Sequence, residues 1–112
     1  MSVRVTTTVA KILSAFLADA EEPQYGMHLM GVTGLASGTV YPILARLEKE
    51  GWVTGVKENI DPTVEGRPAR KQYLLTQTGR AAARQALAEL HEATRLHERP
   101  SAWASSRPAP QQ

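Results

Sequence analysis

Residues 37–51, SGTVYPILARLEKEG, constrain the fold more than any other stretch of this 112-residue chain. Their apolar side chains recur at steps of three and four, the period of one helical face, and they are Val40, Ile43, Leu44 and Leu47. Ser37 is a predicted N-cap, and Gly51 is predicted to end the helix in a left-handed conformation. The stretch therefore predicts a helix whose back is buried in the protein.

The front of this helix is small near its start and basic further along. A helical wheel puts opposite the apolar back Gly38, Pro42, Ala45, Arg46 and Lys49. A helix that enters the major groove of DNA needs such a front, because bulk near its N-terminus would hold the backbone away from the bases. An ordinary surface helix fits the same pattern, so this stretch alone leaves both interpretations open.

Two strands joined by a long polar loop are predicted after this helix. The first covers 52–57, WVTGVK, and the second covers 71–76, KQYLLT. Because the loop ends in basic residues, the ribbon resembles the wing of a winged helix-turn-helix, a mainly α fold with a two-stranded β wing. We expect Arg67 to enter the minor groove of DNA, and Arg70 and Lys71 to contact phosphates.

Three further helices complete the expected domain. One covers 7–18 behind a threonine cap, a second covers 25–32, and a long last helix covers 79–97 with Thr78 as its cap. The last helix carries a heptad-like seam, and the apolar face of the first is wide enough to pack against its own domain and a second subunit. The residues expected in a homodimer interface are Val9, Ile12, Leu13, Phe16, Ala83, Leu87, Leu90 and Thr94.

The sequence lacks the motifs that are typical of several other classes of function. There is no cysteine, the three histidines are scattered, and no phosphate-binding loop or nucleophile motif occurs, so we expect no catalytic residue, metal or cofactor. The start of the chain is not a convincing leader because Lys11 interrupts its apolar run, and no stretch could span a membrane. We expect a cytoplasmic protein without membrane contacts and without enzymatic activity.

The stretch 38–53, GTVYPILARLEKEGWV, is similar to the GTLYPxLxRLExxGLI signature of the PadR family of transcriptional regulators. Further echoes of the family are Gly66-Arg67-Pro68, Tyr73-Leu74-Leu75-Thr76 and Thr78-Gly79-Arg80. The resemblance covers roughly residues 7–99 and implies a short form that dimerises through one C-terminal helix. It departs from the family around Gly31 and Gly34, where a longer and more polar second helix is usual.

The resemblance and the residues together give one prediction of function. The protein is expected to bind a palindromic operator in double-stranded DNA as a homodimer, as a regulator and most simply a repressor. The residues expected on DNA are Ser37, Gly38, Thr39, Tyr41, Pro42, Arg46, Lys49, Arg67, Arg70 and Lys71. The alternative is a winged helix that binds a partner protein, because basic residues are sparse on the third helix.

The expected organisation has three parts. They are a DNA-binding domain over 1–78, a dimerisation helix over 79–99 and a disordered tail over 100–112. Some regulators of the resembled family bind flat apolar compounds between subunits, but no aromatic residue lies between Tyr73 and Trp103 here. A small-molecule effector therefore stays unidentified, and so does any role of Trp103.

Overall fold

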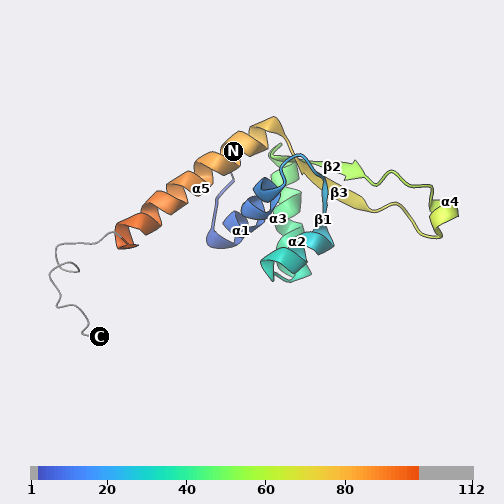
Figure 1. Ribbon diagram of the computed structural model, residues 1–112, viewed down its shortest axis with the longest axis horizontal. Coiled ribbons are helices and arrows are strands. Elements are labelled where there is room, and N and C mark those ends of the chain that lie inside the picture. Colours follow the sequence, from blue (N-terminus) through green and yellow to red (C-terminus); the bar gives the residue numbers. More distant parts are fainter. Residues whose placement is uncertain (1–2, 99–112) are drawn as a thin grey trace.

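The computed structural model describes residues 3–98 of the chain. Its elements in order are α1 (Thr7–Ala18), β1 (Gln24–Tyr25), α2 (Gly26–Thr33), α3 (Ser37–Lys49), β2 (Val53–Lys57), α4 (Pro62–Glu65), β3 (Lys71–Leu75) and α5 (Gln77–Glu98). Helices α1 to α3 form a body, while the β2–β3 ribbon and α5 project from it in opposite directions (Figure 1). This arrangement confirms the predicted fold, mainly α with a β wing. The expected tail over 100–112, including Trp103, lies outside the described residues.

The body is held together by a core that α1, α3 and the sheet share. Its most deeply buried side chains include Ile12, Leu13, Phe16, Leu29, Val40, Leu44, Leu47 and Val53. Burying one side chain of this size contributes roughly 1.5–3 kcal/mol to folding before the loss of chain entropy is counted. The helical period read from residues 37–51 is thus correct, and it fixes which face of α3 is left for solvent.

The position of α1 corrects part of the predicted dimer interface. Val9, Ile12, Leu13 and Phe16 are each at most 7% exposed in the single chain. Ala83 of α5 is fully buried as well. These five side chains already fill the chain's own core, so they are not available to a second subunit. The apolar stripe of α1 was wide because one chain needs all of it.

Helix α3 ends at its predicted residue, Lys49, but begins one residue earlier than predicted and is capped differently. Ala36 occupies the N-cap position without a side-chain hydrogen bond, and Ser37 is the first helical residue, so the predicted cap is wrong. Gly51 follows the helix with φ +80°, as predicted. Pro42 lies inside the helix, where it has no N–H to offer the carbonyl of Gly38.

The sheet has one strand more than expected. Residues Gln24 and Tyr25 pair with Gln72 and Tyr73 of β3, which gives the order β1-β3-β2. All pairing is antiparallel, and the predicted ribbon of β2 and β3 is present from Val53 to Leu75. The extra strand matters because it ties the start of α2 to the root of the wing.

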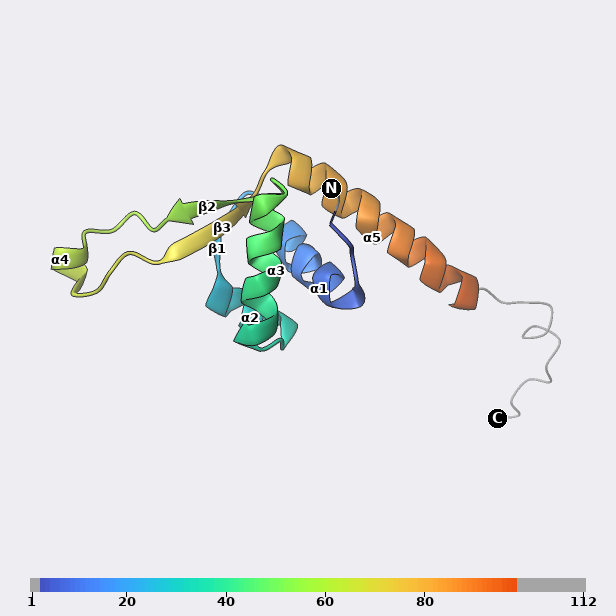
Figure 2. The same ribbon diagram turned by 180° about the vertical axis from the view of Figure 1, so that it is seen from behind.

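The wing loop contains a one-turn helix that the sequence pattern did not suggest. Asp61 accepts a hydrogen bond from the N–H of Thr63, Pro62 starts the turn, and Gly66 ends it with φ +71°. The turn lies at the far end of the wing (Figure 2). Its carboxylates, Asp61 and Glu65, make this tip acidic rather than basic.

The corner between β3 and α5 is built on Thr76 and not on the predicted cap Thr78. The Thr76 hydroxyl accepts from the N–H of Gly79 at 2.9 Å and donates to the carbonyl of Gly51 at 2.6 Å. The backbone N–H of Thr76 donates to the carbonyl of Trp52 at 3.0 Å. Because β3 ends one residue earlier than expected, Thr76 is the residue free to cap.

Gly79 tests how tightly this corner is packed. A Cβ at this position would lie 1.8 Å from the carbonyl oxygen of Trp52, and a backbone atom cannot swing aside. We expect Gly79→Ala to destabilise the protein by about 2 kcal/mol or more in urea unfolding. Gly31→Ala is the control, because open space surrounds that helical glycine and alanine should stabilise the helix by about 0.5–1 kcal/mol. Equal effects of the two substitutions would contradict the packing at the corner.

Candidate nucleic-acid interface

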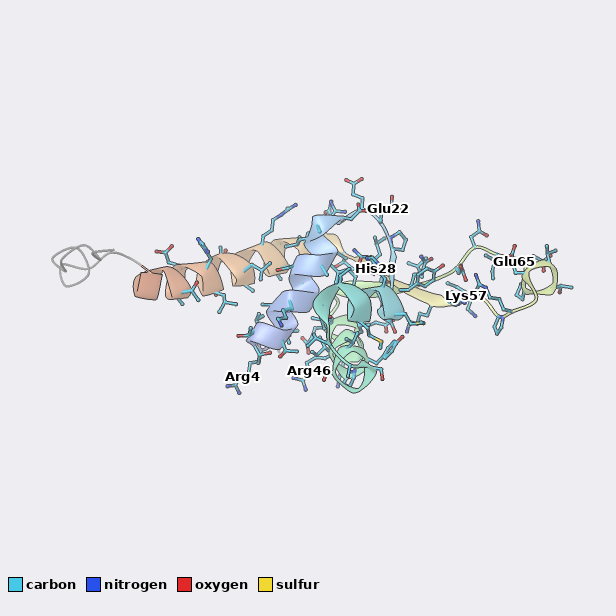
Figure 3. The ribbon with its side chains drawn as sticks, turned by 60° about the horizontal axis from the view of Figure 1, so that its bottom comes forward. Arg4, Glu22, His28, Arg46, Lys57 and Glu65 are labelled. Atoms are coloured by element: carbon cyan, nitrogen blue, oxygen red, sulfur yellow. The ribbon has the colours of Figure 1, made fainter. Side chains whose placement is uncertain are left out.

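The outward face of α3 is exposed along its whole length. Every residue that the wheel put opposite the core is solvent-exposed, namely Gly38, Pro42, Ala45, Arg46 and Lys49. Thr39 is half-buried at the edge of this face, and Ser37 is exposed at its start. The face therefore offers little side-chain bulk at the first turns and two cations at the last turns. Figure 3 shows Arg46 pointing away from the body.

Tyr41 lies on the shoulder of α3, where it contacts α2. A Cβ on Gly26 would lie 2.5–2.6 Å from ring atoms of Tyr41, so the ring packs directly on the α2 backbone. The side chain is nevertheless 40% exposed. The glycine that opens α2 thus sets the position of an aromatic ring at the edge of the interface, and the phenol remains accessible.

The basic residues predicted on DNA fall into two groups. Among residues 3–98, Arg46, Lys49 and Arg70 have no carboxylate partner, whereas Lys71 and Arg67 are each paired. Lys71 Nζ lies 3.0 Å from Glu48 Oε1, and both side chains are about half exposed. Such a surface pair contributes about 0–1 kcal/mol, so Lys71 can exchange its partner for a phosphate at small cost. Arg70 lies over the ring of Tyr25, 5.9 Å from its centroid.

Glu58, the residue after β2, gathers four hydrogen bonds at the root of the wing. The Arg67 guanidinium donates to both carboxylate oxygens, at 2.8 and 3.0 Å, and the N–H of Arg70 donates at 3.1 Å. The hydroxyl of Tyr25 donates the fourth. The Glu58 side chain is only 12% exposed. One carboxylate therefore joins the strand ends of the wing to β1 and α2.

These contacts shift the titration of the groups involved. The hydrogen bonds from Arg67 and then Tyr25 lower the pKa of Glu58 from 4.5 to about 2. The hydrogen bond to Glu58 raises the pKa of Tyr25 in turn. Glu48 raises the pKa of Lys71 in the same way. Near neutral pH, Glu58 and Lys71 are therefore charged and Tyr25 keeps its proton.

The minor-groove contact expected for Arg67 stays a prediction, and the Arg67 side chain is held in an ion pair with Glu58. Its guanidinium lies at the root of the wing, where it bonds Glu58 and the carbonyl of Pro68. The side chain is 32% exposed, and a contact with the minor groove would have to break the pair with Glu58. Sequence reasoning could not foresee this, because it read the run of cations without knowing that Glu58 lies across the strand ladder from it.

The described part of the chain gives little support for a metal site or a membrane-spanning segment. Within residues 3–98, no three histidine, aspartate or glutamate side chains gather as metal ligands would. No helix over the same range is long and apolar enough to cross a membrane.

An exposed helix following a short helix and a turn, beside a β ribbon, defines the winged helix-turn-helix class of transcriptional regulators. Residues 16–85, more than half of the chain, match the transcriptional regulator PadR-like family. The chain belongs to this family, whose members are transcriptional regulators rather than enzymes.

Solved structures of similar fold carry the same assignment. A PadR family transcriptional regulator from Eggerthella lenta is 25% identical with a TM-score of 0.60, over 79% of each chain. A PadR-like transcription factor from Bacteroides fragilis is 21% identical with a TM-score of 0.65, over 85% of this chain and 93% of the other. A PadR-like regulator from Bacillus cereus is 23% identical with a TM-score of 0.55, over 82% and 91%. No curated protein matches the sequence.

The Glu58 cluster predicts a dependence of stability on pH. A carboxyl whose pKa falls on folding stabilises the protein above its unfolded value, and this stabilisation is lost as the pH drops from 4.5 toward 2. We expect Glu58→Gln to be less stable than the unaltered protein near neutral pH, and the difference to shrink across that acid range. Urea unfolding at a series of pH values measures it.

Glu65→Gln is the control, because it removes an exposed carboxylate from the same wing without breaking the cluster. A difference between the unaltered protein and Glu58→Gln that stays constant down to the lowest pH would show that the carboxylate charge does not matter.

Proposed function

We propose that the protein is a repressor that occupies a palindromic DNA operator as a homodimer, with α3 of each subunit in the major groove. The observation that carries the proposal is the exposed front of α3, small at its first turns and bearing Arg46 and Lys49 without acidic partners. A helix with this front can approach base edges closely, so that Arg46 can reach a base while Lys49 meets the phosphate backbone.

The readout is divided between base edges and phosphates. Gly38, Thr39, Pro42 and Arg46 are proposed at the base edges, with Tyr41 at their border and Ser37 at the entry of the helix. Arginine can bond guanine with two hydrogen bonds, and each such contact is worth about 1–3 kcal/mol of discrimination. Lys49, Arg70 and Lys71 are proposed on phosphates, which fix register without reading sequence. Arg67 is proposed to position the wing instead of contacting DNA.

Dimerisation is proposed through the exposed part of α5. Leu87 and Leu90 are only partly buried, and Thr94 continues their seam toward solvent. Hollows lined by α1 residues on one side and by Val3, Val5 and Trp52 on the other flank Leu90. A two-fold axis along this seam would present two α3 helices about 34–36 Å apart, one turn of DNA. Bound in the cytoplasm at such a site, the dimer would exclude polymerase.

One observation favours a second candidate, a winged helix that binds a partner protein. The wing tip is acidic, and Val64 on α4 is 76% exposed. An acidic tip with an exposed apolar side chain suits protein contact better than phosphate contact. The two candidates differ in salt dependence, because binding to DNA phosphates weakens steeply with added salt.

Selection from a random-sequence duplex library, with bound DNA sequenced, tests the proposal. We expect one palindromic sequence to be recovered, and Gly38→Leu to weaken binding to it about 10- to 100-fold. Open space surrounds Gly38, so the substitution adds bulk to the DNA-facing front without a clash inside the protein.

Ala18→Leu adds similar bulk at an exposed position of α1 and is expected to leave binding unchanged. Recovery of only diffuse sequences, with no response to Gly38→Leu, would favour the partner-protein candidate.

Leu90→Gln tests the dimer separately. The substitution removes an apolar side chain from the centre of the seam, and we expect it to raise the dimer dissociation constant at least tenfold in sedimentation equilibrium. Ala88→Gln, an exposed position on a different face of α5, is the control and should leave the constant unchanged. A dimer equally stable in both variants would place the interface elsewhere.

A further inference from the structure

The segment before α1 is fixed to the body by two valines. Val3 is 7% exposed and belongs to the hydrophobic core, and Val5 packs against that core. Together with Trp52 and residues of α5 they line one hollow. Arg4, between them, is exposed. Alternate residues of this segment therefore face opposite ways, and burial of the valines holds the backbone of the arginine in place.

Arg4 points to the same side of the molecule as the recognition helix. Figure 3 shows the Arg4 and Arg46 side chains extending from one edge of the molecule. In that view Arg46 lies between Arg4 and the wing residues Lys57 and Glu65. The N-terminal segment and the wing also lie on opposite sides of α3 in Figure 2. Both views thus place the N-terminal segment and the wing on opposite sides of α3.

The chain segment around Arg4 carries no carboxylate of its own. No acidic residue occurs from Val3 to Ala18. Over the described range, Arg4 makes neither an ion pair nor a hydrogen bond with another side chain. A guanidinium with five free donors and a fixed backbone binds a phosphate with two parallel hydrogen bonds at a small cost in chain entropy.

We propose that Arg4 contacts a phosphodiester of the DNA backbone on the side of α3 opposite the wing. This inference rests on the proposed function, because it needs α3 in the major groove. The wing and the N-terminal segment then hold the two phosphate walls of that groove, Arg70 on one side and Arg4 on the other. The contact adds affinity and register without reading a base.

Arg4→Gln, measured on the selected operator over a range of salt concentrations, tests the contact. Removing one phosphate contact lowers the slope of log affinity against log salt by about 0.9 for each arginine lost. We expect that decrease, with affinity for operator and for unrelated duplex reduced by a similar factor. Arg4→Lys keeps the charge and should restore the slope.

Arg84→Gln is the matched control, with the same loss of an arginine at an exposed position of α5. Arg84 lies one helical turn before Ala88, on the face of α5 that does not carry the seam. Equal decreases for Arg84→Gln and Arg4→Gln would mean a general effect of charge and would overturn the contact. An unchanged slope in Arg4→Gln would overturn it too.

A second measurement alters the DNA instead of the protein's charge. Duplexes carrying one neutral methylphosphonate in place of a backbone phosphate, moved along the operator flanks, locate the phosphate involved. At that phosphate the unaltered protein should lose affinity and Arg4→Gln should not. If every position affects both proteins alike, the inference fails while the proposed function stands. If the unaltered protein selects no sequence at all, the proposed function fails first.

Discussion

The geometry of the wing depends on one carboxylate. Glu58 meets Arg67, Arg70 and Tyr25 where β2 ends and β3 begins, so the strands are clamped before the long loop opens. Without this clamp, the projecting end of the ribbon would depend on backbone pairing and on the exposed Lys71–Glu48 pair, and isolated ribbons are marginally stable. Because Tyr25 also belongs to β1 and precedes α2, the clamp fixes the wing relative to the helices that carry α3. The spacing between Arg70 and Arg46 follows from it.

The sequence was sufficient for the large elements and insufficient for their ends. The bounds of α1 and α3 and the β2–β3 ribbon follow from hydrophobic period and β-branched content, which act locally. Caps were less predictable. Ser37 and Thr78 are residue types that cap helices well, but Ala36 holds the cap position of α3 and the Thr76 hydroxyl caps α5. Strand β1 could not be foreseen, since two residues carry no period and pair only because the folded body brings them to β3.

The face of α3 could be read from a wheel, but the state of each cation could not. Arg67 and Arg70 stand three residues apart in one basic run, yet only the side chain of Arg67 is bound to Glu58, while Arg70 reaches it with its backbone N–H. The difference arises from the antiparallel ladder, which puts Glu58 and Arg70 opposite each other, with the backbone N–H of Glu58 donating to the Arg70 carbonyl. Sequence also misjudged α1, whose apolar stripe is consumed by the core of one chain.

The corner at Thr76 has a mechanical consequence. The start of α5 touches the backbone of Trp52 so closely that no side chain fits at Gly79. Trp52 follows α3 after a single tight turn, and the backbone N–H of Trp52 donates to the carbonyl of Leu47. The packed corner therefore holds the axis of α5 at a fixed angle to the axis of α3. In an assembly of two copies joined through α5, a small rotation of one α5 against the other would change the distance between the two α3 helices by a much larger amount.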